Sequence, residues 1–256
     1  MERETYEIGD YANADIARAI DLDIDRVPDP SNPATQWRPL FSEIHLTKTK
    51  KARKIDDLDT LVRDRDKYLA GSQLLARPSC PTQARKLAPM TAGEIAAYAN
   101  SLQPVGNTYH DIGMIWGGRL LSPTGLFASE NSDQPGQPTS RHMIFLTDGE
   151  TATAPFNYGT YGLEMVEERR WKTRSRTTLN QTVERRFAFA CEEVKKKNIT
   201  VWVISFGTAA NPVMQSCAGP NRYFVADDAR QLEDAFATIA KRMGDLRVTR
   251  GDGSRP

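Results

Sequence analysis

The sequence predicts an α/β fold with a parallel sheet, and two observations carry that prediction. From Thr91 onward, amphipathic helical stretches alternate with short apolar runs, which is typical of a parallel sheet covered on both faces. The apolar run 143–147 stops at Asp148-Gly149, as a buried strand does when it ends at a sheet edge. Ligands of open α/β sheets bind beyond the carboxyl ends of the strands, so Asp148 is the first candidate site residue. The alternative is that Asp148 only opens a turn, because Asp-Gly is a common turn pair.

The other elements follow from capping signals and apolar spacing. Thr91 with Glu94 forms a capping-box pattern, which predicts a helix ending near Leu102. Apolar residues at helical spacing predict three more helices, marked by Ile112, Ile115, Trp116 and Leu120; by Val183, Phe187, Cys191 and Val194; and by Leu232, Phe236, Ile239 and Met243. Continuous apolar runs predict further strands at 199–206 and 222–225. Gly117 and Gly118 are expected to allow close helix packing.

Residues 1–86 differ from the rest of the chain and are expected to form an irregular insertion or extended lobe. Four prolines between residues 28 and 39 interrupt any regular pattern, and charged residues dominate 48–67. The basic run 48–54 is followed at once by acidic residues that cancel its field, which favours a solvated helical face over a nucleic-acid patch. The organised domain is therefore assigned to residues 87–250.

Composition excludes several classes of protein. The 256 residues contain 34 Lys and Arg against 33 Asp and Glu, so the net charge of +1 gives no reason to expect a nucleic-acid partner. We expect no membrane span in this chain, and its first ten residues lack the apolar core of a signal peptide. No phosphate-loop, dinucleotide or nucleophile-elbow motif occurs. A metal-dependent hydrolase built on Asp148 with His110 or His142 is kept as a minor alternative.

The strand, the Leu-Thr-Asp-Gly turn and the following helix resemble the von Willebrand factor A-like domain, a Rossmann-like three-layer sandwich. In that family, this Asp and a Thr placed before a helix serve a metal-ion-dependent adhesion site. Asp148 and Thr108, in Gly106-Asn107-Thr108, match these positions. The resemblance thus implies that both contribute oxygen ligands to Mg²⁺, which favours octahedral oxygen coordination. Thr108 is equally open to interpretation as a helix N-cap.

A closer resemblance is to the C-terminal portion of TadG-like proteins of the tight-adherence (Flp) pilus machinery. It rests on five ordered segments: 80–89, 106–123 with its Trp-Gly-Gly-Arg-Leu-Leu-Ser-Pro run, 145–149, 191–206 and 217–247. The resemblance implies a non-enzymatic role in pilus assembly or tight adherence, other pilus-assembly or envelope proteins as partners, and a periplasmic or cell-surface location. The alternative within binding modules is a soluble A-like adhesion module unrelated to pili.

One departure from the family concerns its first metal loop. The family's first strand ends in an Asp-x-Ser-x-Ser motif, and this sequence contains none; 21–25 has acids but no serine. The chain is therefore expected to lack the first strand and to be a portion of an anchored parent that itself holds Mg²⁺. With Thr108 and Asp148 alone, we expect no tight Mg²⁺ binding, and a missing strand would leave an open sheet edge and marginal stability.

Two further sets of residues are candidates for function. Cys191 and Cys217 lie on either side of the long apolar strand and are a candidate disulfide in an oxidising compartment. Cys80 would then pair with a cysteine upstream of this chain. The alternative is that all three cysteines are buried or free thiols. The residues that follow the turn are candidates for partner binding, namely Gly149, Glu150, Arg169 and Arg170. For the basic residues, the alternative is a solvated surface loop.

Overall fold

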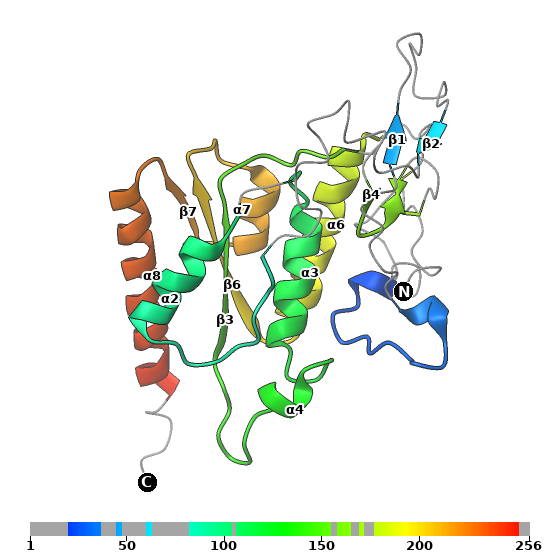
Figure 1. The fold of residues 1–256 in the computed structure, drawn as a ribbon. Coiled ribbons are helices and arrows are strands. Elements are labelled where there is room, and N and C mark those ends of the chain that lie inside the picture. Colours follow the sequence, from blue (N-terminus) through cyan, green and yellow to red (C-terminus); the bar gives the residue numbers. More distant parts are fainter. Residues whose placement is uncertain are drawn as a thin grey trace. The chain divides into compact units, whose positions relative to one another are not determined.

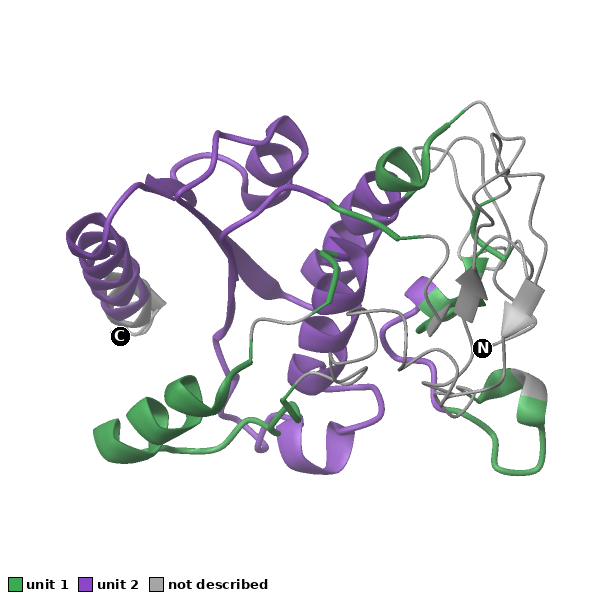
Figure 2. Ribbon diagram, turned by 45° about the horizontal axis from the view of Figure 1, so that its top comes forward, with its two compact units in different colours: residues 1–21, 28–108, 152–182 green, residues 22–27, 109–151, 183–256 purple. Residues whose placement is uncertain are grey.

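The computed structural model describes residues 20–36, 45–47, 60–62, 82–103, 106–154, 158–164, 169–171 and 177–250. The chain divides into two compact units, which Figure 2 colours separately. The first unit contains residues 1–21, 28–108 and 152–182, and the second contains residues 22–27, 109–151 and 183–256. The expected boundary between residues 86 and 87 is not a division point of these units, and the assignment of 87–250 to one domain stays a prediction.

The second unit is built on a three-stranded parallel sheet, which confirms the α/β class. Its strands are β3 (Arg141–Thr147), β6 (Ile199–Phe206) and β7 (Tyr223–Ala226), in the spatial order β3-β6-β7. Thr147 lies beside Ser205, and Phe206 lies beside Ala226. All three strands therefore end at one edge of the sheet. Among the described residues, β3 pairs with β6 alone and is an edge strand.

Helices cover both faces of this sheet, giving three layers (Figure 1). One face carries α8 (Ala229–Arg250), and the other carries α3 (His110–Leu121), α6 (Leu179–Lys195) and α7 (Pro212–Ala218). A short helix, α4 (Ala128–Asn131), lies in the connection from α3 to β3. The apolar spacing thus predicted α3, α6 and α8 correctly, and α7 was missed.

The apolar residues of each layer meet where their spacing predicts. On the α8 side, the buried cluster comprises Trp202, Ile204, Ala226, Ala235 and Ile239. On the other side, the predicted stripe of α6 is fully buried. A Cβ added to Gly117 would lie 3.0 Å from Met143 Cε, and one added to Gly118 would lie 2.6 Å from Val194 Cγ2. The two glycines of α3 therefore allow close packing, as predicted.

The first unit contains short elements. The strands β1 (His45–Thr47) and β2 (Thr60–Val62) are antiparallel, as are β4 (Tyr158–Gly159) and β5 (Gly162–Leu163). The basic run 48–54, expected to form a solvated helical face, lies outside the described residues. Two 3-10 turns are η3 (Ile20–Leu22), which reaches the second unit, and η4 (Pro33–Thr35). Helix α2 (Ala92–Ser101) begins with the predicted Thr91–Glu94 capping box.

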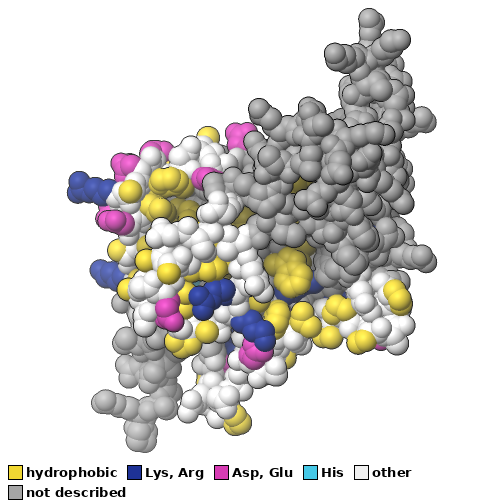
Figure 3. Space-filling view, in the orientation of Figure 1, with side chains coloured by type: hydrophobic (Ala, Val, Ile, Leu, Met, Phe, Trp, Pro, Cys, Tyr) yellow, Lys and Arg dark blue, Asp and Glu magenta, His cyan; other side chains and the backbone are white. Residues whose placement is uncertain are grey.

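The described residues can be compared with two classes considered above, membrane-spanning proteins and nucleic-acid-binding proteins. No helix within these ranges has the length and apolarity needed to cross a bilayer. On the face shown in Figure 3, basic and acidic side chains of the described residues are interspersed rather than gathered into a block of one sign.

Candidate functional site

The turn after β3 presents an exposed carboxylate at the carboxyl end of the sheet. Thr147 is the last residue of β3, and its Oγ1 accepts a hydrogen bond from the Gly149 N–H at 3.3 Å. Asp148 and Glu150 on this turn are exposed. Neither carboxylate has a hydrogen-bond or ion-pair partner in the described parts of the chain. Asp148 is therefore open to a ligand at the edge where the sequence predicted a site.

A buried histidine holds this turn from beneath. His110, the first residue of α3, is 5% exposed, and its Nδ1 lies 3.0 Å from Thr151 Oγ1 while its Nε2 lies 3.1 Å from Thr147 Oγ1. Burial lowers the pKa of His110 below its ordinary value, against the opposing effects of the Asp111 charge and a hydrogen bond to the Gly149 backbone. The ring is therefore neutral near pH 7, donating from one nitrogen and accepting at the other.

Aromatic rings and a buried ion pair form the floor below His110. Its ring meets those of Phe145 and Phe187 edge-on, with centroids 5.8 Å and 6.2 Å away. The neighbouring Asp111 is fully buried and its Oδ2 accepts from Nε of the equally buried Arg186 at 3.0 Å. A buried charge pair of this kind requires both partners, because either one alone would be an uncompensated charge.

This geometry is suited to holding the turn in place. Both nitrogens of His110 are already bonded to threonine hydroxyls, so the ring supports the turn. His142 is no alternative base, because it lies at the start of β3, where its Nδ1 accepts from Trp202 Nε1 at 3.1 Å. At about 3.3 Å per residue, Asp148 lies roughly 20 Å along the chain from it. The pairing of His142 with Asp148 in a hydrolase site is thus wrong.

Thr108 lies in the first unit and Asp148 in the second. Thr108 is half-buried and forms an isolated antiparallel bridge with Ala152, donating its N–H to the Ala152 carbonyl at 2.8 Å. The N-cap of α3 is Tyr109, so the N-cap interpretation of Thr108 is corrected: the helix begins one residue later than that interpretation requires. The role of Thr108 and Asp148 as joint metal ligands stays a prediction.

The described part of the turn offers few unoccupied oxygen ligands to Mg²⁺. Among the described residues, no three or more His, Cys, Asp or Glu side chains are grouped as a metal would need. The hydroxyls of Thr147 and Thr151 are both engaged with His110. Mg²⁺ takes about six oxygen ligands in near-octahedral geometry. Within the turn, the exposed carboxylates are those of Asp148 and Glu150.

The structure joins Cys191 of α6 and Cys217 of α7 in a disulfide bond, with 5.9 Å between their Cα atoms. Both cysteines are buried, at 0% and 3% exposure. Free thiols were the alternative for this pair. Cys80 lies outside the described residues.

The two arginines proposed for partner binding belong to the first unit and differ in exposure. Arg169 is half-buried. Arg170 is 2% exposed, forms an ion pair with Glu164 at 2.5 Å and lies over the Tyr161 ring at 4.1 Å. The Tyr161 hydroxyl in turn donates to the buried Asp21 carboxylate. Arg170 is therefore a core residue, and its expected place on a solvated loop is corrected because a buried acid neutralises it. The neighbouring 172–176 lies outside the described residues.

Sequence reasoning missed the support beneath the turn. Thr147 and Thr151 are 37 and 41 residues from His110, and no local pattern links such distant positions. Two polar residues at the start of α3 could have indicated this support. His110 and Asp111 open an otherwise apolar helix, which implies buried partners for both side chains. Arg186 carried a similar signal, since it lies between the apolar positions Val183 and Phe187 of α6.

Comparisons with known proteins give no match. No protein-family model, no curated protein and no solved structure matches this chain. A functional proposal therefore rests on the fold, the turn geometry and the motifs of the sequence.

Proposed function

We propose that this chain is a non-enzymatic protein-binding component of the bacterial envelope, serving Flp pilus assembly or tight adherence through a von Willebrand factor A-like domain. The observation that carries the proposal is the exposed, unpaired carboxylate of Asp148 at the carboxyl end of β3. The turn that bears it is anchored by His110, so the carboxylate is presented from a rigid base. A fixed charge with few internal partners is available for a partner's polar groups.

The partner's contact is expected to involve this turn directly. Glu150 adds a second exposed carboxylate two residues after Asp148. If the parent protein holds Mg²⁺, Asp148 and Thr108 are the residues of this chain that would bind it, and the ion would supply a link to an acidic group of the partner. In this chain alone, the carboxylates themselves form the contact.

The disulfide supports the proposed location. Disulfides persist in oxidising compartments such as the bacterial periplasm and cell surface and are rare in the cytosol. The pair joins two buried positions in the core of the second unit, α6 and α7. A bridge of this kind agrees with an envelope protein.

The proposal is tested by replacing Asp148 with Ala in the native gene and measuring surface pili and adherence. Asp227 provides a matched control, because it is also an exposed acid directly after a strand of the same sheet, β7. We expect Asp148→Ala to reduce pilus display at unchanged protein level and Asp227→Ala to leave it unchanged. Normal pili with the Asp148 variant would contradict the proposed role of the turn; normal pili without the whole protein would contradict the pilus function.

A further inference from the structure

A short segment near the amino terminus is embedded in the second unit. Leu22–Val27, called the strap below, belongs to the second unit although residues on both sides of it belong to the first. Leu22 is 0% exposed and Ile24 is 1% exposed. The strap is thus a six-residue peptide that is buried in the second unit without being part of its sheet or of α3, α6, α7 and α8.

Two glycines shape the groove that receives the backbone and Ile24. A Cβ added to Gly118 of α3 would lie 3.1 Å from Ile24 Cγ2. A Cβ added to Gly125 would lie 3.0 Å from Asp25 Cα and 3.1 Å from the Ile24 carbonyl oxygen. Larger residues at either position would occupy the space of the strap. The glycines therefore permit the close approach of the strap, whose backbone turns between Asp23 and Arg26.

The groove also recognises the acid that follows Ile24. The Asp25 carboxylate accepts hydrogen bonds from Ser122 Oγ at 2.5 Å and Thr124 Oγ1 at 2.6 Å, and it forms an ion pair with Lys197. Burial raises the pKa of Asp25, but the hydrogen bonds from Lys197, Ser122 and Thr124 outweigh it and leave the pKa below its usual value. This pocket therefore favours a charged carboxylate.

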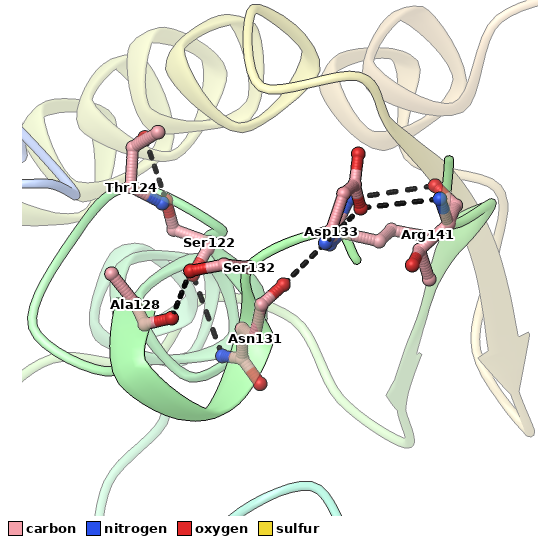
Figure 4. A network of polar contacts seen from close by, with 8 residues as sticks. Ser122, Thr124, Ala128, Asn131, Ser132, Asp133 and Arg141 are labelled. Carbon is pink, nitrogen blue, oxygen red and sulfur yellow. Dashed lines mark hydrogen bonds and ion pairs between the residues drawn. The ribbon is translucent and has the colours of Figure 1, made fainter. Parts of the chain in front are cut away.

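The donors of the acid pocket are themselves fixed. The amide of Asn131 donates to the Leu120 carbonyl at 2.7 Å. It also donates to the Ser122 carbonyl at 3.4 Å, and the Asn131 carbonyl accepts from Arg141 (Figure 4). The loop that carries Ser122 and Thr124 is thus tied to the end of α3 and to the start of β3. A preorganised set of donors gives selectivity for the group that it fits.

We propose that this groove is a peptide-recognition site for the pattern aliphatic, any residue, aliphatic, aspartate, and that the strap is its resident ligand. The occupant that replaces the strap is a segment of a partner protein with the same pattern. Two apolar anchors two residues apart provide burial, and one carboxylate with three donors provides specificity. Because the strap is covalently attached, its effective concentration is of the order of millimolar, so the site is closed in the resting chain.

The test uses the full chain with the strap disabled by Leu22→Asp and Ile24→Asp. Binding of a fluorescent peptide with the sequence of residues 20–28 is followed by anisotropy. We expect the peptide to bind the strap-disabled chain at least about tenfold more tightly than the wild type, whose groove is filled. A peptide carrying Asp25→Asn should bind about tenfold or more weakly, because it loses the charge that Lys197 pairs. Equal binding of both peptides would overturn the proposal.

A second pair of measurements separates recognition from simple loss of folding. In the strap-disabled chain, Lys197→Met should weaken the native peptide but not the Asp25→Asn peptide. In the wild type, hydrogen exchange reports opening of the strap through two bonded amides, Asp25 N–H to Asp23 Oδ1 and Arg26 N–H to the Asp23 carbonyl. We expect added native peptide to leave the β6 amides unchanged and to speed exchange of these two amides. Exchange of the strap only together with β6 would show an integral core segment and overturn the proposal.

Discussion

The acids around the strap and the start of β3 differ from Asp148, which lies at the opposite end of the sheet. Around the start of β3, Asp133 pairs with Arg141 at 2.7 Å, and in the strap groove Asp25 is bonded to two hydroxyls and to Lys197. At the carboxyl end, Asp148 is exposed and has no partner among the described residues. Paired acids hold loops in place, whereas the unpaired acid contributes little to stability and remains available for binding.

The residues beneath the turn at the carboxyl end of the sheet are nonetheless firmly held. Its exposed turn lies on a layer in which every named polar group is satisfied: His110 bonds to Thr147 and Thr151, and Asp111 pairs with Arg186. At this end of the sheet, the buried polar groups stabilise the fold, and the exposed carboxylate of Asp148 is available for binding. The predictions below test that difference.

The largest expected effect comes from breaking the buried pair beneath the turn. Arg186→Met leaves Asp111 as an uncompensated buried charge and should lower the free energy of unfolding by about 3–5 kcal/mol, measured by urea denaturation. The double variant Asp111→Leu with Arg186→Met should recover most of that loss, because no isolated charge remains. A single variant as stable as the wild type would contradict the stabilising role of this ion pair.

A smaller effect is expected when single carboxylates at the two ends are compared. Asp25→Ala removes the acceptor for Ser122, Thr124 and Lys197 and should lower the free energy of unfolding by about 1–2 kcal/mol. Asp148→Ala should change it by less than about 0.5 kcal/mol. Both values come from the same urea titration. Equal losses would mean that Asp148 has a structural partner and would weaken its proposed binding role.

The two ends should also respond to different ranges of pH. The folded-state pKa of His110 is lowered from its ordinary 6.5, so the unfolded chain takes up a proton first and stability falls as the pH drops below that value. The pKa values of Asp25 and Asp133 are lowered from 3.8, so their contribution is present above that value and is lost as the pH falls through the folded-state pKa.

Urea unfolding at several pH values checks this order. Between about pH 7 and pH 5, His110→Gln should flatten the pH dependence, while Asp25→Asn should leave it unchanged. Below that range, Asp25→Asn should flatten it instead. A wild-type stability that rises on acidification toward pH 5 would contradict the assignment of a neutral His110.

The smallest effect is expected from Mg²⁺. Calorimetry on this chain should detect no binding in the micromolar range, because the turn offers only two carboxylates, Asp148 and Glu150, to an ion that takes about six oxygen ligands. Addition of Mg²⁺ should likewise leave the melting temperature unchanged. Micromolar binding that is lost in Asp148→Ala would show that the chain completes the site with other residues.

Sequence predicted the elements whose apolar periodicity is strong. The stripe from Val183 to Val194 predicted the type of α6, and the apolar run at 199–206 predicted both the type and the bounds of β6. Helix α7 was missed because seven residues are too few to show a period, although Asn211 before Pro212 is a typical helix start.

The candidate site was predicted in part for a related reason. Asp148 could be placed because the strand before it is local in sequence. The partners of His110 and the residues that receive the strap are joined only by folding: Asp25 and Ser122 are 97 residues apart. Polar contacts of this range depend on the relative position of several elements, which no single-sequence pattern encodes.

The disulfide gives the second unit a mechanical property. Cys191 and Cys217 are separated by 26 residues, and the central strand β6 lies wholly within the covalent loop that they close. Tension applied along the chain passes through the sulfur bridge and bypasses β6. At about 3.5 Å per extended residue, roughly 90 Å of chain is thereby withheld from stretching until the bridge is reduced. A protein proposed to serve adhesion would thus prevent the backbone between the two cysteines from being extended while its ends are pulled.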